Sequence, residues 1–277
     1  MFFTFSGRQV GSTVVNLSRL LFAFLMISSV HFLLFGTFLP LDAESYRWGW
    51  LALSSFLGLV VGDSALFQAF VLIGPRLSAL MMSLVPIFTT FFGWLLFSET
   101  ITGLEFLGIL LTMSSVAWVV SERRTGQIAV QHKQYGLGIM FGLVGAFGQA
   151  SGLITAKFGL VGSFPPASAN VIRMLVAMLI LWTLAAFQGR IRSTVSHWHN
   201  RKALAGILGG TFFGPFVGVW LSLTAIQLTR VGIASTLMAL TPIILIPLSY
   251  FFYKEPITLR SVTGTIVAII GVALIFL

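Results

Sequence analysis

One carboxylate lies well inside an apolar stretch, and it is the residue that most directly suggests chemistry. Asp63 sits in the run LGLVVGDSALFQ at positions 57–68. A charge at the centre of a bilayer costs about 2.5–3.5 kcal/mol on insertion scales, so a cavity, a partner cation or protonation must offset it. Asp63 is therefore a candidate proton- or cation-coupling site, or a contact for a substrate amine. The alternative is a neutral or paired acid that holds helices together.

Other polar side chains in or near apolar stretches are further candidates for contact with a small molecule. Arg19, Arg173 and Lys157 could bind an anionic group or pair with an acid, or their charged ends could snorkel to the membrane interface. Amides and aromatic rings suit a cavity for a small amphipathic molecule, but they also join helices or form interfacial belts. This class contains Gln68, Gln149, Asn170, Gln227, Trp94, Trp118, Trp182, Trp220 and Tyr250. Besides Asp63, our candidates for substrate or coupling contacts are Gln68, Arg19, Arg173, Gln149, Lys157 and Trp220.

The sequence offers no support for enzyme chemistry. The chain has no cysteine, which excludes disulfides, thiolate metal sites and cysteine nucleophiles. His197 and His199 are a weak metal signal in a basic loop. Nucleotide-binding loops and metalloprotease motifs are absent from the sequence. We therefore expect a protein that is not an enzyme and that has no catalytic residue, metal or cofactor.

Membrane-spanning helices must position these residues. The chain is 57% hydrophobic and 8% charged, whereas a soluble domain is about 25% charged. Apolar runs close to the roughly 20 residues that cross a bilayer recur along it. The sequence predicts an all-α integral membrane protein with nine visible spans, at residues 14–36, 48–71, 76–97, 103–120, 136–158, 167–187, 203–226, 231–252 and 258–276. The net charge of +9 lies mostly in short loops, where it sets orientation and does not indicate nucleic-acid binding.

The second half of the chain repeats the first at an offset of 156 residues. Ten residues are identical between 82–117 and 238–273. Apolar residues match by chance in membrane segments, but four other matches are harder to dismiss: Pro86, Glu99, Thr102 and Gly108 match Pro242, Glu255, Thr258 and Gly264. We interpret them as a structural helix–turn–helix corner that holds each half together. Within it, Thr102 and Glu105 fit a capping box.

The duplication also suggests a domain organisation. A match upstream, at an offset of 154, pairs Asn16 and Arg19 with Asn170 and Arg173. We expect a first repeat of four visible helices at residues 1–122, a basic linker at 123–134 and a second repeat of five helices at 135–277. The counterpart of segment 136–158 would have to precede Met1. Either the chain starts late or a first helix was lost.

Small residues and prolines inside the spans carry expectations about packing. Small residues at four-residue spacing share a helix face and let backbones approach closely. Such faces contain Gly138, Gly142, Ala146 and Ala150; Gly206, Gly210, Gly214 and Gly218; and Gly58 with Gly62. We expect these faces to pack, and the same surfaces could slide during transport. Proline removes a backbone hydrogen bond, so kinks are expected at Pro86, Pro215, Pro242 and Pro247.

The repeated pattern, with proline in one helix, glutamate at its end and glycine in the next, resembles the EamA-type proteins of the drug/metabolite transporter superfamily. The resemblance covers nearly the whole chain. It implies ten helices in two inverted five-helix repeats, of which the first helix is missing here. Five helices per repeat make consecutive repeats enter the membrane from opposite sides, as in many secondary transporters.

The resemblance implies a permease in the cell (inner or plasma) membrane, embedded in the lipid bilayer, that exports small metabolites or amino acids by alternating access. A small-molecule substrate and protons as coupling ion are the expected partners. Two other classes stay open. A membrane-embedded lipid enzyme predicts His, Asp or Glu clustered at one membrane face, and a scaffold or partner subunit without transport predicts a co-purifying partner. The sequence leaves the substrate, the direction and the oligomeric state open.

Charge and resemblance disagree about orientation. Loops on one side carry twelve Lys and Arg residues, and loops on the other side carry four, which are Arg47, Lys157, Arg173 and Arg230. The positive-inside rule places the twelve in the cytoplasm and the C-terminus outside. The family picture has both termini in the cytoplasm and implies the reverse. We expect the orientation that the charges favour.

Overall fold

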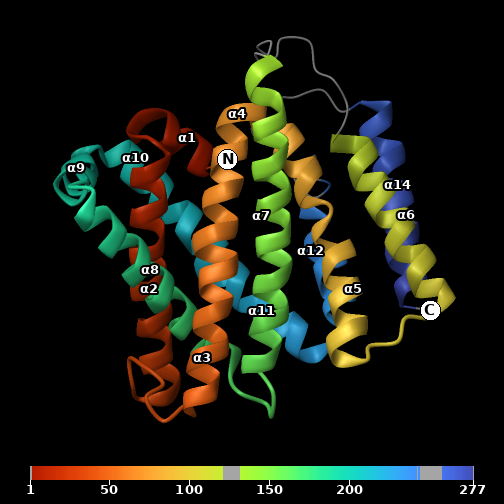
Figure 1. Ribbon diagram of the computed structural model, residues 1–277, viewed down its shortest axis with the longest axis horizontal. Helices are drawn as coiled ribbons and strands as arrows, with labels where there is room; N and C mark the ends of the chain where they lie inside the picture. Colours follow the sequence, from red (N-terminus) through yellow and green to blue (C-terminus); the bar gives the residue numbers. More distant parts are fainter. Residues whose placement is uncertain (1, 121–131, 242, 244–257, 277) are drawn as a thin grey trace. The chain divides into compact units, whose positions relative to one another are not determined.

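The computed structural model describes residues 2–120, 132–241, 243 and 258–276, and their regular structure is helical throughout. In chain order the elements are α1 (Phe2–Val10), α2 (Ser12–Phe35), α3 (Ser45–Ser54), η1 (Ser55–Gly62), α4 (Asp63–Met82), α5 (Val85–Phe97), α6 (Gly103–Val120), α7 (His132–Gly159), α8 (Pro166–Phe187), α9 (Ile191–Ser196), η2 (His197–His199), α10 (Arg201–Thr211), η3 (Phe212–Gly218), α11 (Val219–Leu228), α12 (Val231–Met238) and α14 (Leu259–Ile275) (Figure 1). Segments η1 and η3 are π-helical, and η2 is a 3₁₀-helix.

The predicted all-α membrane class is confirmed. Within the described residues, six helical stretches are long and apolar enough to cross a bilayer: Thr13–Phe35, Ser45–Ile73, Ser78–Phe97, Tyr135–Gly159, Pro166–Phe187 and Arg201–Leu228. Two shorter apolar helices are Gly103–Val119 and Val262–Ile275. The expected span 231–252 is described only in part, because residues 242 and 244–252 lie outside the described residues.

The sequence predicted a kink at Pro86 inside a helix, but Pro86 does not lie in the interior of a helix. It lies in the first turn of α5, after a break at Ser83 and Leu84 that separates α4 from α5. Proline is well suited to the first turn of a helix, where the backbone N–H that it lacks would have no intrahelical partner.

Contacts divide the chain into two compact units, each made from both halves of the sequence. Unit 1 contains residues 1–60 and 155–228, and unit 2 contains residues 61–154 and 229–277. This spatial division differs from the division into sequence repeats at 1–122 and 135–277. The repeat boundaries therefore stay a prediction.

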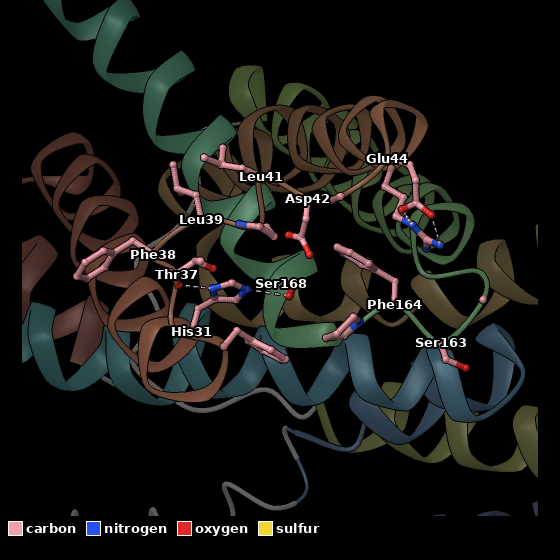
Figure 2. Close-up of a pocket in the computed structure, with 16 residues that line it drawn as sticks. His31, Thr37, Phe38, Leu39, Leu41, Asp42, Glu44, Ser163, Phe164 and Ser168 are labelled. Carbon is pink, nitrogen blue, oxygen red and sulfur yellow. Dashed lines mark hydrogen bonds and ion pairs between the residues drawn. The ribbon is translucent and has the colours of Figure 1, made fainter.

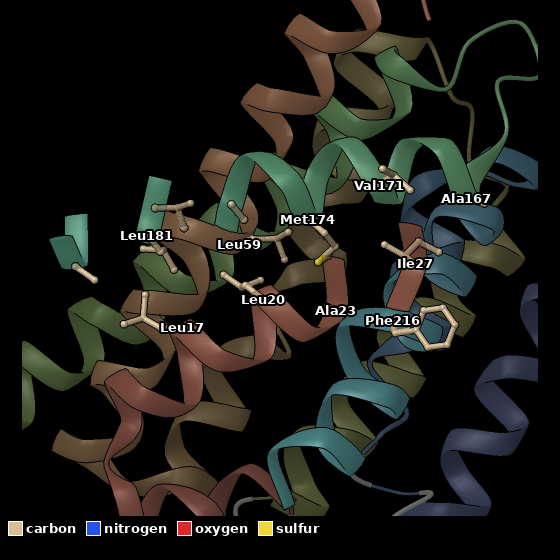
Figure 3. Close-up of a cluster of buried hydrophobic side chains, with 13 residues drawn as sticks. Leu17, Leu20, Ala23, Ile27, Leu59, Ala167, Val171, Met174, Leu181 and Phe216 are labelled. Atoms are coloured by element: carbon tan, nitrogen blue, oxygen red, sulfur yellow. The ribbon is translucent and has the colours of Figure 1, made fainter. Parts of the chain in front are cut away.

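Unit 1 is built around α2 and α8, which run antiparallel. At one end Trp182 Nε1 donates to the Leu17 carbonyl at 3.1 Å, and at the other His31 Nε2 lies 2.9 Å from Ser168 Oγ. Between these contacts lies a buried hydrophobic cluster, to which η1 and η3 also contribute (Figure 3). Its members include Leu17, Leu20, Ala23, Ile27, Leu59, Val171, Met174, Leu181 and Phe216. On α2 the members recur every three or four residues, which places them on one helix face.

Unit 2 contains a close crossing of α6 and α14, which lie side by side in Figure 1. A Cβ atom on Gly108 would stand 2.6 Å from the Gly271 carbonyl oxygen and 2.8 Å from Ile275 Cγ1. A Cβ atom on Gly264 would meet Val119 and Ser115. Glycine at these positions lets the two backbones approach.

The helix α7 packs along α4 in unit 2 through the small residues that the sequence singled out. Added Cβ atoms would contact Ile73 from Gly138 and Met81 from Gly142. At Gly145 an added Cβ atom would be 3.3 Å from the Leu66 backbone nitrogen. These contacts confirm that the face of Gly138 and Gly142 is a packing face.

Candidate functional site

Asp63 is the first residue of α4 and follows η1 directly. Its side chain is 8% exposed. Gln149 of α7 donates Nε2 to Asp63 Oδ1 at 2.5 Å. Two of the candidates chosen from sequence are thus in direct contact, although 86 residues separate them.

The Asp63–Gln149 contact fits both interpretations of the buried acid. The hydrogen bond joins α4 to α7 and so contributes to packing. It also holds the carboxylate in a defined position, as a site that binds a proton or a substrate group requires. The π-helical hydrogen bonds of η1 reach from residue i to i+5, so they change the helical register just before Asp63 and alter the direction of its side chain.

Arg19 and Arg173 are buried in unit 1, with exposed fractions of 7% and 3%. Both side chains are therefore packed against other parts of the unit, and the interpretation that they snorkel to the membrane interface stays a prediction. Arg19 Nε donates to Asn16 Oδ1 at 2.8 Å, and its guanidinium lies 5.7 Å from the centre of the Phe3 ring. The Arg173 carbonyl accepts a hydrogen bond from Ser55 Oγ at 2.6 Å. A role for either arginine in substrate contact stays a prediction.

A pocket of about 950 Å³ opens in unit 1 where α2, α3, α7 and α8 meet their loops (Figure 2). This volume is within the usual range for small-molecule sites. Its walls are the loop after α2 and the loop before α8, including Phe38, Leu41, Asp42 and Phe164. Figure 2 shows the Asp42 carboxylate directed into the pocket. The lining can hold a small molecule with an apolar body and a hydrogen-bond donor or a positive charge.

Arg47 forms one side of this pocket and is 7% exposed. Its Nε donates to Glu44 Oε2 at 2.5 Å, and its Nη1 donates to the carbonyls of Gly159 at 3.1 Å and Val161 at 2.5 Å. The guanidinium also lies 4.8 Å from the centre of the Phe164 ring. The hydrogen bond from Arg47 lowers the pKa of Glu44 below its ordinary value of 4.5. Arg47 therefore ties the loop after α2 to the loop before α8 and neutralises Glu44.

His31 also lines the pocket and is 2% exposed. Its Nδ1 lies 2.6 Å from the Thr37 carbonyl oxygen, so Nδ1 carries the hydrogen and donates. Its Nε2 lies 2.9 Å from Ser168 Oγ. Sequence reasoning missed His31, Asp42, Glu44 and Arg47 as a group. The one available signal was the three-residue spacing of Glu44 and Arg47, which is compatible with an ion pair. Nothing in the sequence indicated that these four residues line the same pocket.

The other candidates lie in different surroundings. Gln68 is exposed on α4, and Lys157 is half-buried in the last turn of α7. Trp220 is half-buried on α11, with its ring centre 6.3 Å from that of Phe216. Arg19, Arg173, Lys157 and Trp220 belong to unit 1, and Asp63, Gln68 and Gln149 belong to unit 2.

The predicted capping box at the start of α6 is confirmed. The Thr102 backbone nitrogen donates to Glu105 Oε2 at 2.8 Å, and the Glu105 nitrogen donates to Thr102 Oγ1 at 3.2 Å. Arg230 forms a bidentate ion pair with the Glu105 carboxylate and also donates a hydrogen bond to the Thr100 carbonyl. The corner is thus joined to the residue that precedes α12.

Glu99 departs from the interpretation that each corner holds its own half together. Its carboxylate accepts from the Val231 backbone nitrogen, at 3.1 Å to Oε2 and 3.3 Å to Oε1. It therefore caps α12, which belongs to the second half of the sequence, and an anion at a helix N-terminus is stabilising. Of the matching residues, Thr258 lies just before α14 and Gly264 lies at the α6–α14 crossing, whereas Pro242 and Glu255 lie outside the described residues.

The two π-helical segments are a repeat that sequence reasoning overlooked. Residues 56–62 read FLGLVVG and residues 212–218 read FFGPFVG, again at an offset of 156. They coincide with η1 (Ser55–Gly62) and η3 (Phe212–Gly218). In unit 1, Asn170 Nδ2 donates to the carbonyls of Pro215 at 3.4 Å and Phe216 at 3.3 Å. From sequence alone, Gly58, Gly62, Gly214 and Gly218 indicate only packing faces within single helices.

Comparisons with known proteins agree with this architecture. A search of curated proteins found no match. One solved structure, described only as "Crystal structure of protein", superposes with a TM-score of 0.76 at 14% sequence identity. The superposition covers 98% of this chain and 89% of the other chain. At that identity the likeness concerns the fold alone. The family described as "EamA-like transporter family" matches residues 1–121 and 136–277. The chain is therefore a multi-pass membrane protein that belongs to the EamA-like transporter family.

Proposed function

We propose that this protein is a secondary transporter that exports small metabolites or amino acids across the cell membrane by alternating access. We further propose that Asp63, held by Gln149, is the coupling or substrate contact. The observation that carries the proposal is membership of a transporter family across nearly the whole chain. A small-molecule substrate follows from that membership, and protons are the proposed coupling ion.

The buried carboxylate supports the choice of Asp63. Asp63 is 8% exposed and accepts a hydrogen bond from an uncharged amide. Acids within membrane spans are rare and are often part of proton relays or ion pathways. A carboxylate that gains and loses a proton at this position would change its interaction with α7.

The pairing of equivalent helices supports two inverted repeats. Helices α2 and α8 occupy matching places in the two halves, and they run antiparallel in unit 1. In unit 2 the two glycine contacts at the α6–α14 crossing are related by the 156-residue offset, because Gly271 and Ile275 match Ser115 and Val119. Antiparallel pairing of equivalent helices is what an inverted duplication predicts, and such repeats are common in alternating-access transporters.

The unit 1 pocket supports binding of a small molecule at one end of this unit. The pocket combines aromatic side chains with His31, Ser168 and Asp42. Small-molecule sites are mostly apolar with a few polar groups that orient the ligand. We propose the pocket as a place where the transported molecule binds on entry or release.

The proposal is tested by metabolite efflux from cells that express the full chain. The medium of cells with the wild-type protein should accumulate one or more small metabolites faster than that of cells with an empty vector. Asp63→Asn should lower that efflux about tenfold, which is the effect of roughly 1.4 kcal/mol of lost interaction at the rate-limiting barrier. Ser64→Ala is the matched control, because Ser64 is the exposed neighbour of Asp63. If Asp63→Asn left the efflux and its pH dependence unchanged, the coupling role would be wrong.

A further inference from the structure

Residues 187–202 of unit 1, which we call the basic hairpin, run from the end of α8 through α9 and η2 to the first turn of α10. In Figure 1 α9 lies to the left of α10. Trp198 anchors the hairpin to α2: its Nε1 donates to Ser18 Oγ at 2.8 Å, and its ring centre lies 5.4 Å from that of Phe22. The basic hairpin therefore has a defined place on the unit.

A second set of contacts holds the end of the basic hairpin. Asn200 caps α10 by accepting from the Ala203 backbone nitrogen at 3.1 Å. Its Nδ2 donates to Gln9 Oε1 of α1 at 3.1 Å. Nearby, Ser6 Oγ of α1 donates to the Ala203 carbonyl at 2.9 Å. Both ends of the segment 198–203 are thus tied to neighbouring helices, which restricts where its charged side chains can reach.

The positive charge of the basic hairpin is not neutralised within its unit. Arg190, Arg192, Arg201 and Lys202 are exposed. The residues of unit 1 include only two acids, Asp42 and Glu44, and both follow the far end of α2. Ser18, beside Trp198, is 17 residues from the end of α2 at Phe35, a distance of about 25 Å at 1.5 Å per residue. Among the described residues none of these four basic side chains forms an ion pair.

Exposed apolar side chains stand next to these charges. Phe187 is 88% exposed, Ile191 is 37% exposed and Val195 is 39% exposed. The basic hairpin also begins where α8, a helix long enough to span a membrane, ends. Its basic and apolar groups therefore lie together at the depth where headgroups meet acyl chains. A basic and apolar surface of this kind binds anionic lipid, and clusters of Lys and Arg next to a span bind anionic headgroups.

We propose that the basic hairpin binds the headgroup of an anionic phospholipid. The four exposed basic side chains contact the phosphate and other anionic groups, while Phe187, Ile191 and Val195 contact the acyl chains. A nucleic acid or a soluble acidic peptide would match the charges but would leave the apolar side chains in water. The inference does not depend on transport, and it fixes the face of unit 1 that meets an anionic leaflet.

The test uses the purified full chain in detergent, with phosphatidylglycerol and phosphatidylcholine of identical acyl chains as probes. Lipid retention is measured by native mass spectrometry, and the unfolding midpoint is measured with each lipid. Near an anionic surface each basic side chain adds roughly fivefold in affinity. We therefore expect a preference for phosphatidylglycerol of at least about tenfold. A combined variant, Arg190→Gln, Arg192→Gln, Arg201→Gln and Lys202→Gln, should reduce that preference to within about twofold.

A matched variant keeps the charge: Arg190→Lys, Arg192→Lys and Arg201→Lys should retain the preference. Inorganic phosphate at the same concentration should not shift the unfolding midpoint, because it lacks acyl chains. The inference is overturned if the Gln variant keeps the wild-type preference, if the two lipids bind equally, or if phosphate alone reproduces the shift. All substituted side chains are exposed, and an unchanged midpoint without lipid will show that the variants fold.

Discussion

At the scale of single residues, the contact between Gln149 and Asp63 is the part of the candidate site that can be removed most cleanly. Gln149→Leu keeps the side-chain volume but leaves Asp63 without the amide that bonds it at 2.5 Å. We expect a loss of stability of about 1 kcal/mol, together with slower transport and a displaced pH dependence. Ser64→Ala removes an exposed hydroxyl of α4 that is not a candidate contact, and it should change neither property. Equal transport and equal pH profiles for both variants would remove Gln149 from the site.

Glu44 offers a residue-scale test by pH. Its pKa is lowered by the hydrogen bond from Arg47, so the folded protein binds a proton there less readily than the unfolded chain. The contribution of this pair to stability is therefore fully present above the ordinary pKa of 4.5 and is lost as the pH falls through the lowered pKa. Glu44→Gln should lower the unfolding temperature at pH 7, and the difference from wild type should shrink below about pH 4.5. A difference that stays constant between pH 7 and pH 3 would contradict the role of the pair.

At the scale of elements, the crossing of α6 and α14 depends on glycine. Gly108→Ala would place a Cβ atom 2.6 Å from the Gly271 backbone oxygen, so one of the helices must shift. We expect a destabilisation of about 1–3 kcal/mol, the usual effect of overpacking. Gly103→Ala in the same helix is the matched control, because no atom lies within 4 Å of its added Cβ. Unfolding in increasing denaturant, measured for both variants, checks this; equal midpoints would show that the crossing is loose.

The elements also show what sequence could and could not predict. Apolar runs located the helices because the bilayer sets their length, and Thr102 with Glu105 identified the start of α6 because a capping box is a local motif. The partner of Glu99 could not be found in this way, since Val231 is 132 residues away. The burial of Arg19 and Arg173 was missed for the same reason: hydropathy locates a span but does not show which face packs. The π-helical segments could have been found, because FLGLVVG and FFGPFVG share the offset of the duplication.

At the scale of the whole molecule, orientation in the membrane can be tested directly because the chain has no cysteine. Ser196 and Ser45 are both exposed, and they lie near opposite ends of α2. The charge count predicts that Ser196 faces the cytoplasm. A membrane-impermeant maleimide should therefore label Ser45→Cys in intact cells and Ser196→Cys only after permeabilisation. The opposite pattern would show that the family orientation, with the C-terminus in the cytoplasm, holds instead.

The most direct test of the proposed function is flux of the exported metabolite in proteoliposomes under an imposed proton gradient. The proposal predicts that wild type and Ser64→Ala move the metabolite faster than empty liposomes, that the gradient accelerates this flux, and that Asp63→Asn lowers the flux and abolishes its dependence on the gradient. Flux through Asp63→Asn with the wild-type rate and pH dependence would contradict the role of Asp63. Wild-type flux no faster than that of empty liposomes would contradict transport itself.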